Sequence, residues 1–345
     1  MSRLQSPNEQ LLSCTGFNPK FIDNKTSISL AGILPATYKA HLPNVPGNNK
    51  GILHYTDMSI LYNTKRKLPF TVAYNLDGIE KATTSPKTRF KRDPRIPAHT
   101  QLYYDFYQPV STSPKLEIGH MASNAEMSRG KDAKQKAAHT FHFTNTVPQS
   151  ERLNAGLWRS LENYIIKEAT TAGENKKVIV LTGPVLTNID PAYKLQPGFR
   201  IPLLFYKVVV FMCKGHLYST AFIMSHAKKL INDGLLLEEK PAFKKHRKSY
   251  DVDLFTDFPY REIFQVNILF LEKLSGLSFT WKNVKKINVP EKVRHLIVIH
   301  NTGNAADAKA FKTVRHGRFT IPTTRYVPES AALNEEFKLN MALPR

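Results

Sequence analysis

Hydrophobic positions along the chain predict a sheet of several buried strands. Residues 68–78 alternate large apolar side chains with smaller or polar ones and end at an Asp-Gly turn, which is the pattern of a strand. Nearly continuous apolar runs at 177–186 and 201–213 indicate central strands. Residues 216–226 repeat this character after the Lys214-Gly215 turn, so we expect the last two segments to pair across that turn.

Two segments have apolar residues at helical spacing. Residues 151–170 form the clearer helix, and the apolar positions on one side of it are Leu153, Leu157, Leu161, Tyr164 and Ile165. Ser150 is placed to cap this helix, with Glu151 in its first turn. The second predicted helix covers residues 261–277 and is stopped by Gly276.

Changes in composition divide the chain into three regions. Residues 1–50 are rich in Pro, Asn and Gly, and we expect them to form an N-terminal arm lying on the main domain. Residues 51–285 contain most of the predicted strands and helices and form that main domain. Residues 286–345 are largely polar, and we expect a C-terminal extension whose role the sequence does not indicate.

The charge of the chain adds a class of partner to this picture. Of the 345 residues, 41% are hydrophobic, which is enough for one large core. Lys and Arg outnumber Asp and Glu by 49 to 28, giving a net charge of +21 at pH 7. This excess favours a polyanionic partner, because clustered cations attract phosphate backbones and release counterions. The alternative is a soluble protein that is merely basic.

Two classes of protein are disfavoured by simple counts. Cys14 and Cys213 are the two cysteines, so a disulfide framework is excluded. Residues 1–16 lack the apolar core of a signal peptide, and no run of about 18 apolar residues predicts a membrane span. We expect no membrane partner, and the localisation stays open between the cytoplasm and export by a specialised system.

A group of polar residues surrounds the start of the first helix. A strand predicted over 115–121, a polar and basic loop over 128–138 and a β-prone run over 139–145 lead into that helix. The polar residues with candidate chemistry on these elements are His120, Asn145, Asn154 and Glu162. On an α-helix the last two are about 80° apart and roughly 12 Å apart along the axis, so both can border one groove.

These residue types suit the hydrolysis of a phosphodiester. A neutral imidazole can take a proton from water at neutral pH. An asparagine oxygen is a neutral ligand for a hard cation such as Mg²⁺, and a glutamate can position a water molecule beside it. Each residue also has a purely structural interpretation: His120 as a buried structural histidine, Asn154 as a helix cap and Glu162 as solvated surface. Spacing alone leaves both interpretations open.

The same segments resemble the DNA/RNA non-specific endonuclease family, the ββα-metal or His-Me finger nucleases of endonuclease G-like type. The similarity spans residues 50–281, and the segments that carry it, in the order of the family, are VAYNLDG, TRFKRDPRIP, IGHMA, TFHFTNTVPQSERLNAGLWRSLE, VIVLTGPVL and IFQVNILFLEKLSGLSF. The long central segment is the most specific, because its Asn, Asn and Glu recur at intervals of nine and eight residues. The resemblance implies an α+β fold with a central, mainly antiparallel sheet flanked by helices.

The resemblance also implies a role for each site residue. His120 would be the general base that activates water, and Asn145 would orient its ring. Asn154 would be the direct ligand of one hydrated Mg²⁺, for which Mn²⁺ is a candidate substitute, and Glu162 would hold metal-bound water. Arg89 falls where the family has an arginine that contacts the phosphate.

One departure from the family pattern bears on activity. Where the family has Asp-Arg-Gly-His, residues 117–120 read Glu-Ile-Gly-His, so the arginine is replaced by Ile118. The loss of one phosphate-binding cation weakens transition-state stabilisation by ~2–4 kcal/mol if nothing replaces it. Arg129 or Lys131, in the adjacent loop, could bind the substrate instead, and we favour an active or slowed nuclease.

Two other functions stay open at this point. A degenerate member of the family would bind nucleic acid without cutting it, and a scaffold protein would bind none. Basic stretches at 244–248 and 282–286 fit substrate steering, although such runs are usually solvated surface. A toxin effector is one biological context for a nuclease, and an inhibitor or immunity protein and a homodimer are further candidate partners.

Overall fold

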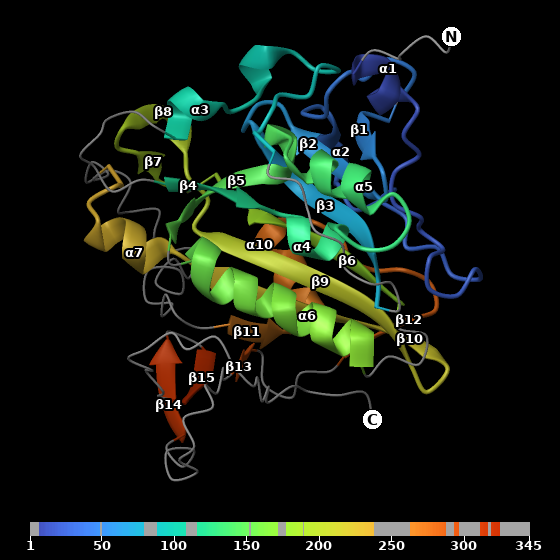
Figure 1. Ribbon diagram of the computed structural model, residues 1–345. Coiled ribbons are helices and arrows are strands. Elements are labelled where there is room, and N and C mark those ends of the chain that lie inside the picture. Colours follow the sequence, from blue (N-terminus) through green and yellow to red (C-terminus); the bar gives the residue numbers. More distant parts are fainter. Residues whose placement is uncertain are drawn as a thin grey trace, which may run out of the picture.

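A mainly antiparallel sheet runs through the centre of the protein (Figure 1). The computed structural model describes residues 7–48, 50–78, 88–107, 116–151, 153–171, 177–188, 190–237, 263–287, 293–296, 311–316 and 319–324. In the order in which they lie in the sheet, the strands are β1 (Ile52–Tyr55), β2 (Met58–Asn63), β3 (Leu68–Asp77), β6 (Lys177–Val185), β9 (Leu204–Cys213), β10 (His216–Ser225), β11 (Ile263–Val266) and β13 (Val293–Leu296). β12 (Val284–Lys286) pairs with β10 in parallel, and the other neighbours are antiparallel.

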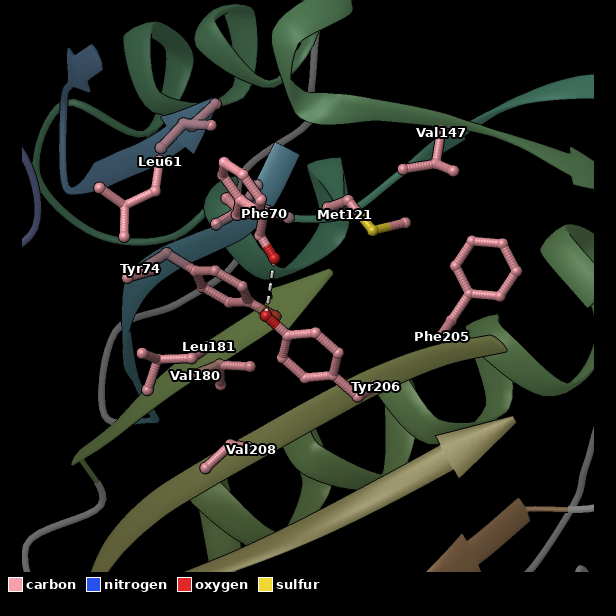
Figure 2. Packing of buried hydrophobic residues seen from close by; sticks show 14 of the residues in the cluster. Leu61, Phe70, Tyr74, Met121, Val147, Val180, Leu181, Phe205, Tyr206 and Val208 are labelled. Atoms are coloured by element: carbon pink, nitrogen blue, oxygen red, sulfur yellow. Dashed lines mark hydrogen bonds between the residues drawn. The ribbon is translucent and has the colours of Figure 1, made fainter. Parts of the chain in front are cut away.

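The central strands are buried over most of their length, as their apolar runs predict. β3, β6 and β10 have buried residues at nearly every position, and β9 is buried from Leu204 to Val210. The predicted hairpin between β9 and β10 is confirmed, with Lys214 and Gly215 both at positive φ in the turn. Figure 2 shows the packing above these strands, where the Tyr206 hydroxyl donates a 2.8 Å hydrogen bond to the Phe70 carbonyl.

A separate pair of strands and a long helix form a ββα unit beside this sheet. β4 (Leu116–His120) pairs antiparallel with β5 (Thr146–Ser150). A π-helix (Leu153–Trp158) and then α6 (Arg159–Thr171) follow β5. In Figure 1, α6 lies across the near face of the sheet and α10 (Ile268–Ser275) lies behind it.

Shorter elements complete the described structure. They are α1 (Pro7–Leu12), α2 (Ala36–Lys39), the 3-10 turn Ala98–Thr100, α3 (Tyr104–Tyr107), α4 (Asn124–Met127), α5 (Ala133–Thr140), the 3-10 turn Phe143–Asn145, β7 (Ala192–Tyr193), β8 (Gln196–Arg200), α7 (Ala227–Asn232), β14 (Phe311–His316) and β15 (Phe319–Thr324). The N-terminal residues Leu11, Phe17 and Ile28 are buried in the main core. The first part of the chain therefore contributes to that core as well as lying on it.

The predicted α+β class, with a central and mainly antiparallel sheet flanked by helices, is confirmed. The second predicted helix is partly wrong, because residues 263–266 form β11 and the helix begins at Ile268. An apolar run of this length fits a buried strand as well as a buried helix. Its end is as predicted, since Gly276 has a φ of 68° and its N–H bonds to the Glu272 carbonyl.

Three further local predictions are wrong. The basic loop predicted over 128–138 contains the start of α5, and the β-prone run over 139–145 contains its end and a 3-10 turn. Tertiary packing overrides β-propensity here, because His139, His142 and Phe143 are buried. Ser150 makes no capping bond: it ends β5, and its hydroxyl is buried without a partner among the described residues.

Candidate active site

His120 is the last residue of β4, and a close contact between two strands places it there. Gly119 lies opposite Val147 in the β4–β5 register, next to Gln149. A Cβ atom on Gly119 would meet the Gln149 side-chain oxygen at 2.0 Å. A glycine before the histidine therefore lets the buried Gln149 side chain cross β4 at this point.

Aromatic rings surround the imidazole of His120. The centroid of its ring lies 4.9 Å from that of Phe90 and 5.0 Å from that of Phe141. Its Nε2 atom is buried and has no hydrogen-bond partner among the described residues, and a catalytic role is one explanation for such an atom. Burial lowers the pKa of His120 to about 4. The imidazole is therefore neutral at pH 7 and able to accept a proton.

Asn145 holds the backbone beside His120. Its Nδ2 donates to the carbonyls of Ala122 and Thr140, and its Oδ1 accepts from the Ala122 N–H, at 2.9 to 3.0 Å. Its carbonyl accepts the N–H of Met121, the residue after His120. Both amide hydrogens are therefore used on the backbone. The orienting role expected for Asn145 stays a prediction, and these bonds allow it to act only through the backbone that carries the ring.

Two hydrogen bonds align the π-helix with β4. Asn154 Nδ2 donates to Glu117 Oε2 at 2.7 Å, and Trp158 Nε1 donates to the His120 carbonyl at 3.2 Å. Asn154 is thereby placed beside the first half of β4, and Trp158 beside its end. The angle of about 80° expected between Asn154 and Glu162 assumed an α-helix throughout, and the π-helix over residues 153–158 corrects that premise.

Glu162 belongs to a buried cluster of charged side chains next to the contact between β4 and the π-helix. It lies on α6, and its Oε1 atom is 3.6 Å from Lys207 Nζ on β9. The same ammonium is 3.6 Å from Glu126 Oε2 on α4. All three side chains are at least nine-tenths buried. On balance the pKa of Glu162 lies above its ordinary value, because burial, with a further contribution from Glu126, outweighs the attraction of Lys207.

Sequence reasoning missed three residues of this site: Glu117, Glu126 and Lys207. Lys207 could have been found from the sequence, because it is a lysine within the apolar run 201–213, at a position where a central strand is buried. Glu126 had a weaker signal, the Ser-x-x-Glu capping box that it forms with Ser123. Neither signal indicates which other side chains meet the residue.

The predicted phosphate-binding residues lie on two separate segments of the chain. Arg89 is exposed and precedes Phe90, the residue whose ring contacts His120. Arg129 is half-buried and Lys131 exposed, both on the connection between α4 and α5. Ile118 is half-buried and shares a face of β4 with His120, so an apolar side chain stands where the family has its arginine.

The donor set fits one hydrated divalent cation. In the described part of the chain, no group of three or more His, Cys, Asp or Glu residues is placed to hold a metal ion. Asn154 commits its Nδ2 to Glu117, which leaves Oδ1 as the amide atom able to bind a hard cation. The nearby carboxylate of Glu117 adds negative charge beside this oxygen. Such a site suits Mg²⁺, which keeps most of its waters.

Two further observations concern possible membrane-spanning helices and the basic stretches of the chain. Among the residues that the structure describes, no helix is long and apolar enough to cross a membrane. The basic stretch 282–286 includes strand β12, whereas the stretch 244–248 lies outside the described residues.

Comparisons with known proteins point to one family. A family model described as DNA/RNA non-specific endonuclease matches residues 39–286. The mitochondrial nuclease EXOG of Homo sapiens is 28% identical over 233 residues, which are 65% of this chain and 55% of that protein. The EXOG of Danio rerio is 29% identical over 134 residues, or 38% of this chain and 36% of that protein. The matches thus span little more than half of these relatives at most.

A solved structure is similar as well. The crystal structure of the EndoG/EndoGI complex, described as showing the mechanism of EndoG inhibition, superposes with a TM-score of 0.47 and 19% sequence identity. The superposition covers 70% of this chain and 89% of that chain.

Proposed function

Because the chain belongs to the DNA/RNA non-specific endonuclease family, we propose that it is a metal-dependent nuclease that hydrolyses phosphodiester bonds of both DNA and RNA. The observation that carries the proposal is the pair of hydrogen bonds between β4 and the π-helix. There, one hydrogen bond positions Asn154 and another ties Trp158 to His120. The proposed base and the proposed metal ligand thus come from two elements that are bonded to each other.

Four residues of the candidate site have a task in the proposed reaction. His120, neutral at pH 7, takes a proton from the attacking water. Asn154 holds the cation through Oδ1, Glu162 holds a water of its hydration shell, and Asn145 fixes the backbone next to the base. A bound Mg²⁺ or Mn²⁺ supplies Lewis-acid stabilisation of the charge that develops on the phosphate.

The missing arginine is replaced, in this proposal, by cations from other segments. Arg89 is the first candidate, because the neighbouring ring of Phe90 packs against His120. Arg129 and Lys131 lie on the connection between α4 and α5. An arginine that binds a phosphate with two parallel N–H groups is the stronger ligand, so Arg89 and Arg129 rank above Lys131.

A second candidate function rests on Ile118. If no other cation stabilises the transition state, the protein binds nucleic acid without cutting it. This function predicts gel-shift binding that persists in the absence of hydrolysis. A toxin role, an inhibitor or immunity partner and a homodimer stay predictions.

The test is cleavage of supercoiled plasmid and of a structured RNA, each with Mg²⁺, with Mn²⁺ or with EDTA. We expect degradation of both substrates that requires the metal and that falls by about 10²- to 10⁴-fold in His120→Ala. Cleavage that is equal in His120→Ala would exclude the proposed base. Binding without any cleavage by the unaltered protein would favour the second function.

A further inference from the structure

A single lysine ammonium lies at the centre of the buried charges behind the site. Lys207 is fully buried on β9, in the middle of the central sheet. Its Nζ atom donates to the Tyr74 hydroxyl at 3.2 Å and to the Met121 carbonyl at 3.3 Å. It also lies 3.6 Å from a carboxylate oxygen of Glu126 and of Glu162. Four elements therefore meet at one cation.

Stability alone does not account for this arrangement. Moving an ammonium and two carboxylates out of water costs several kcal/mol for each ion, on the order of what their mutual attraction returns. A well-packed apolar side chain in place of such a cluster is often neutral or stabilising. A cluster that holds two carboxylates to one cation therefore suggests a task in the site next to it.

The contacts of Lys207 connect the two halves of that site. Met121, whose carbonyl it binds, directly follows His120 on the chain. Trp158, whose ring lies 4.7 Å from Lys207 Nζ, donates to the His120 carbonyl. Glu162 lies one turn further along the helix from Trp158. The Lys207 ammonium therefore contacts both the groups that hold the backbone at His120, which are the Met121 carbonyl and the Trp158 ring, and the Glu162 carboxylate.

We propose that Lys207 is a positioning residue that fixes the Glu162 carboxylate relative to His120, with Glu126 as the second counter-charge. The inference rests on the proposed nuclease function. Lys207 does not meet the substrate: it acts through Glu162 and through the backbone after His120. Loss of a group that orients a metal-site residue typically lowers activity by about 10- to 100-fold.

The test compares Lys207→Met with the charge-balanced pair Lys207→Met/Glu126→Gln. Met keeps the length of the apolar stem and removes the charge, which leaves two buried carboxylates without a cation. We expect a loss of stability and a fall in kcat of about 10- to 100-fold with a nearly unchanged KM. The double variant removes one carboxylate, so we expect it to regain stability while kcat stays low. A double variant that regains both would overturn the inference, because Lys207 would then only balance charge.

A matched control removes a cation from another buried carboxylate. Arg66 binds Asp190 at 2.6 Å and the carbonyls of Thr187 and Arg200 at 2.9 Å, away from the residues of the site. Arg66→Met should lose stability without a change in kcat. An equal fall in kcat in this variant would show that kcat follows general destabilisation, and would count against a positioning role.

Crystal structures separate this inference from the proposed function. The nuclease proposal fails if the unaltered protein cleaves neither DNA nor RNA with Mg²⁺ or Mn²⁺. In that case the position of the Glu162 carboxylate in the double variant still decides the role of Lys207. A carboxylate that has moved away from the Met121 carbonyl supports positioning by Lys207, and an unmoved one overturns it.

Discussion

The aromatic rings around His120 should set the pH at which the protein loses activity. Burial lowers the pKa of this imidazole to about 4, and the neutral form is the one that accepts a proton. kcat/KM should therefore stay constant from pH 8 to pH 5, because it falls only as the pH drops through the lowered pKa. In Phe90→Ala, water reaches the ring, the pKa rises, and kcat/KM should already decline below about pH 6.5.

The measurement is kcat/KM on plasmid DNA between pH 5 and pH 8. Phe211→Ala is the control, because Phe211 stacks on Tyr218 at the far end of β9. It should keep the flat profile. An identical profile for the Phe90 and Phe211 variants would mean that the rings do not desolvate the base.

At the scale of single residues, the sequence predicts types and order well but contacts poorly. His120, Asn154 and Glu162 lie on elements that the structure brings together. The family resemblance singles these residues out from the sequence, and their roles stay predictions. The partners of Glu162 come from β9 and α4, and no local pattern indicates that these side chains meet. The bonds of Asn145 to the backbone were also beyond prediction, because they depend on the turn after β4.

At the scale of elements, the bond between Trp158 and the His120 carbonyl should hold the π-helix against β4. Trp158→Phe keeps an aromatic ring but removes the N–H donor. We expect a loss of about 1 kcal/mol in the free energy of unfolding together with a several-fold fall in kcat. The reason is that Asn154 and His120 would no longer be held in register.

Trp281→Phe is the matched control, since its Nε1 donates at 3.0 Å to the Ser29 carbonyl, outside the site. Chemical unfolding and single-turnover cleavage measure the two effects. Trp281→Phe should lose similar stability and keep its kcat. Equal kcat values in the two variants would show that the Trp158 bond has no part in positioning.

Element types were predictable where the hydrophobic period was long and regular. The strands at 68–78, 177–186 and 216–226 were predicted nearly to their ends. The π-helix was not, because the buried residues Leu153 and Trp158 do not distinguish its wider turn from an α-helix. π-bulges are frequent at functional sites, and the segment wrongly predicted as an α-helix is also the one that carries the proposed metal ligand Asn154.

At the scale of the whole molecule, buried neutral histidines should make the fold sensitive to acid. Burial lowers the pKa of His139 to about 3 and that of His226 to about 4. Each accepts a backbone N–H at 3.1 Å through Nδ1, from Thr56 and from Ser150, and protonation would break that bond. In the unfolded chain both rings titrate near pH 6.5.

Between pH 6.5 and pH 4 the unfolded chain therefore binds more protons than the native protein, so the free energy of unfolding falls as the pH falls. Each unit of difference in pKa corresponds to about 1.4 kcal/mol. His226→Gln cannot titrate, so although it starts from a lower stability, its stability should fall less between pH 7 and pH 5. Urea unfolding at pH 7, 6 and 5 measures this slope, with the exposed His216→Gln as control. Parallel slopes for the His226 and His216 variants would mean that the acid sensitivity comes from other groups.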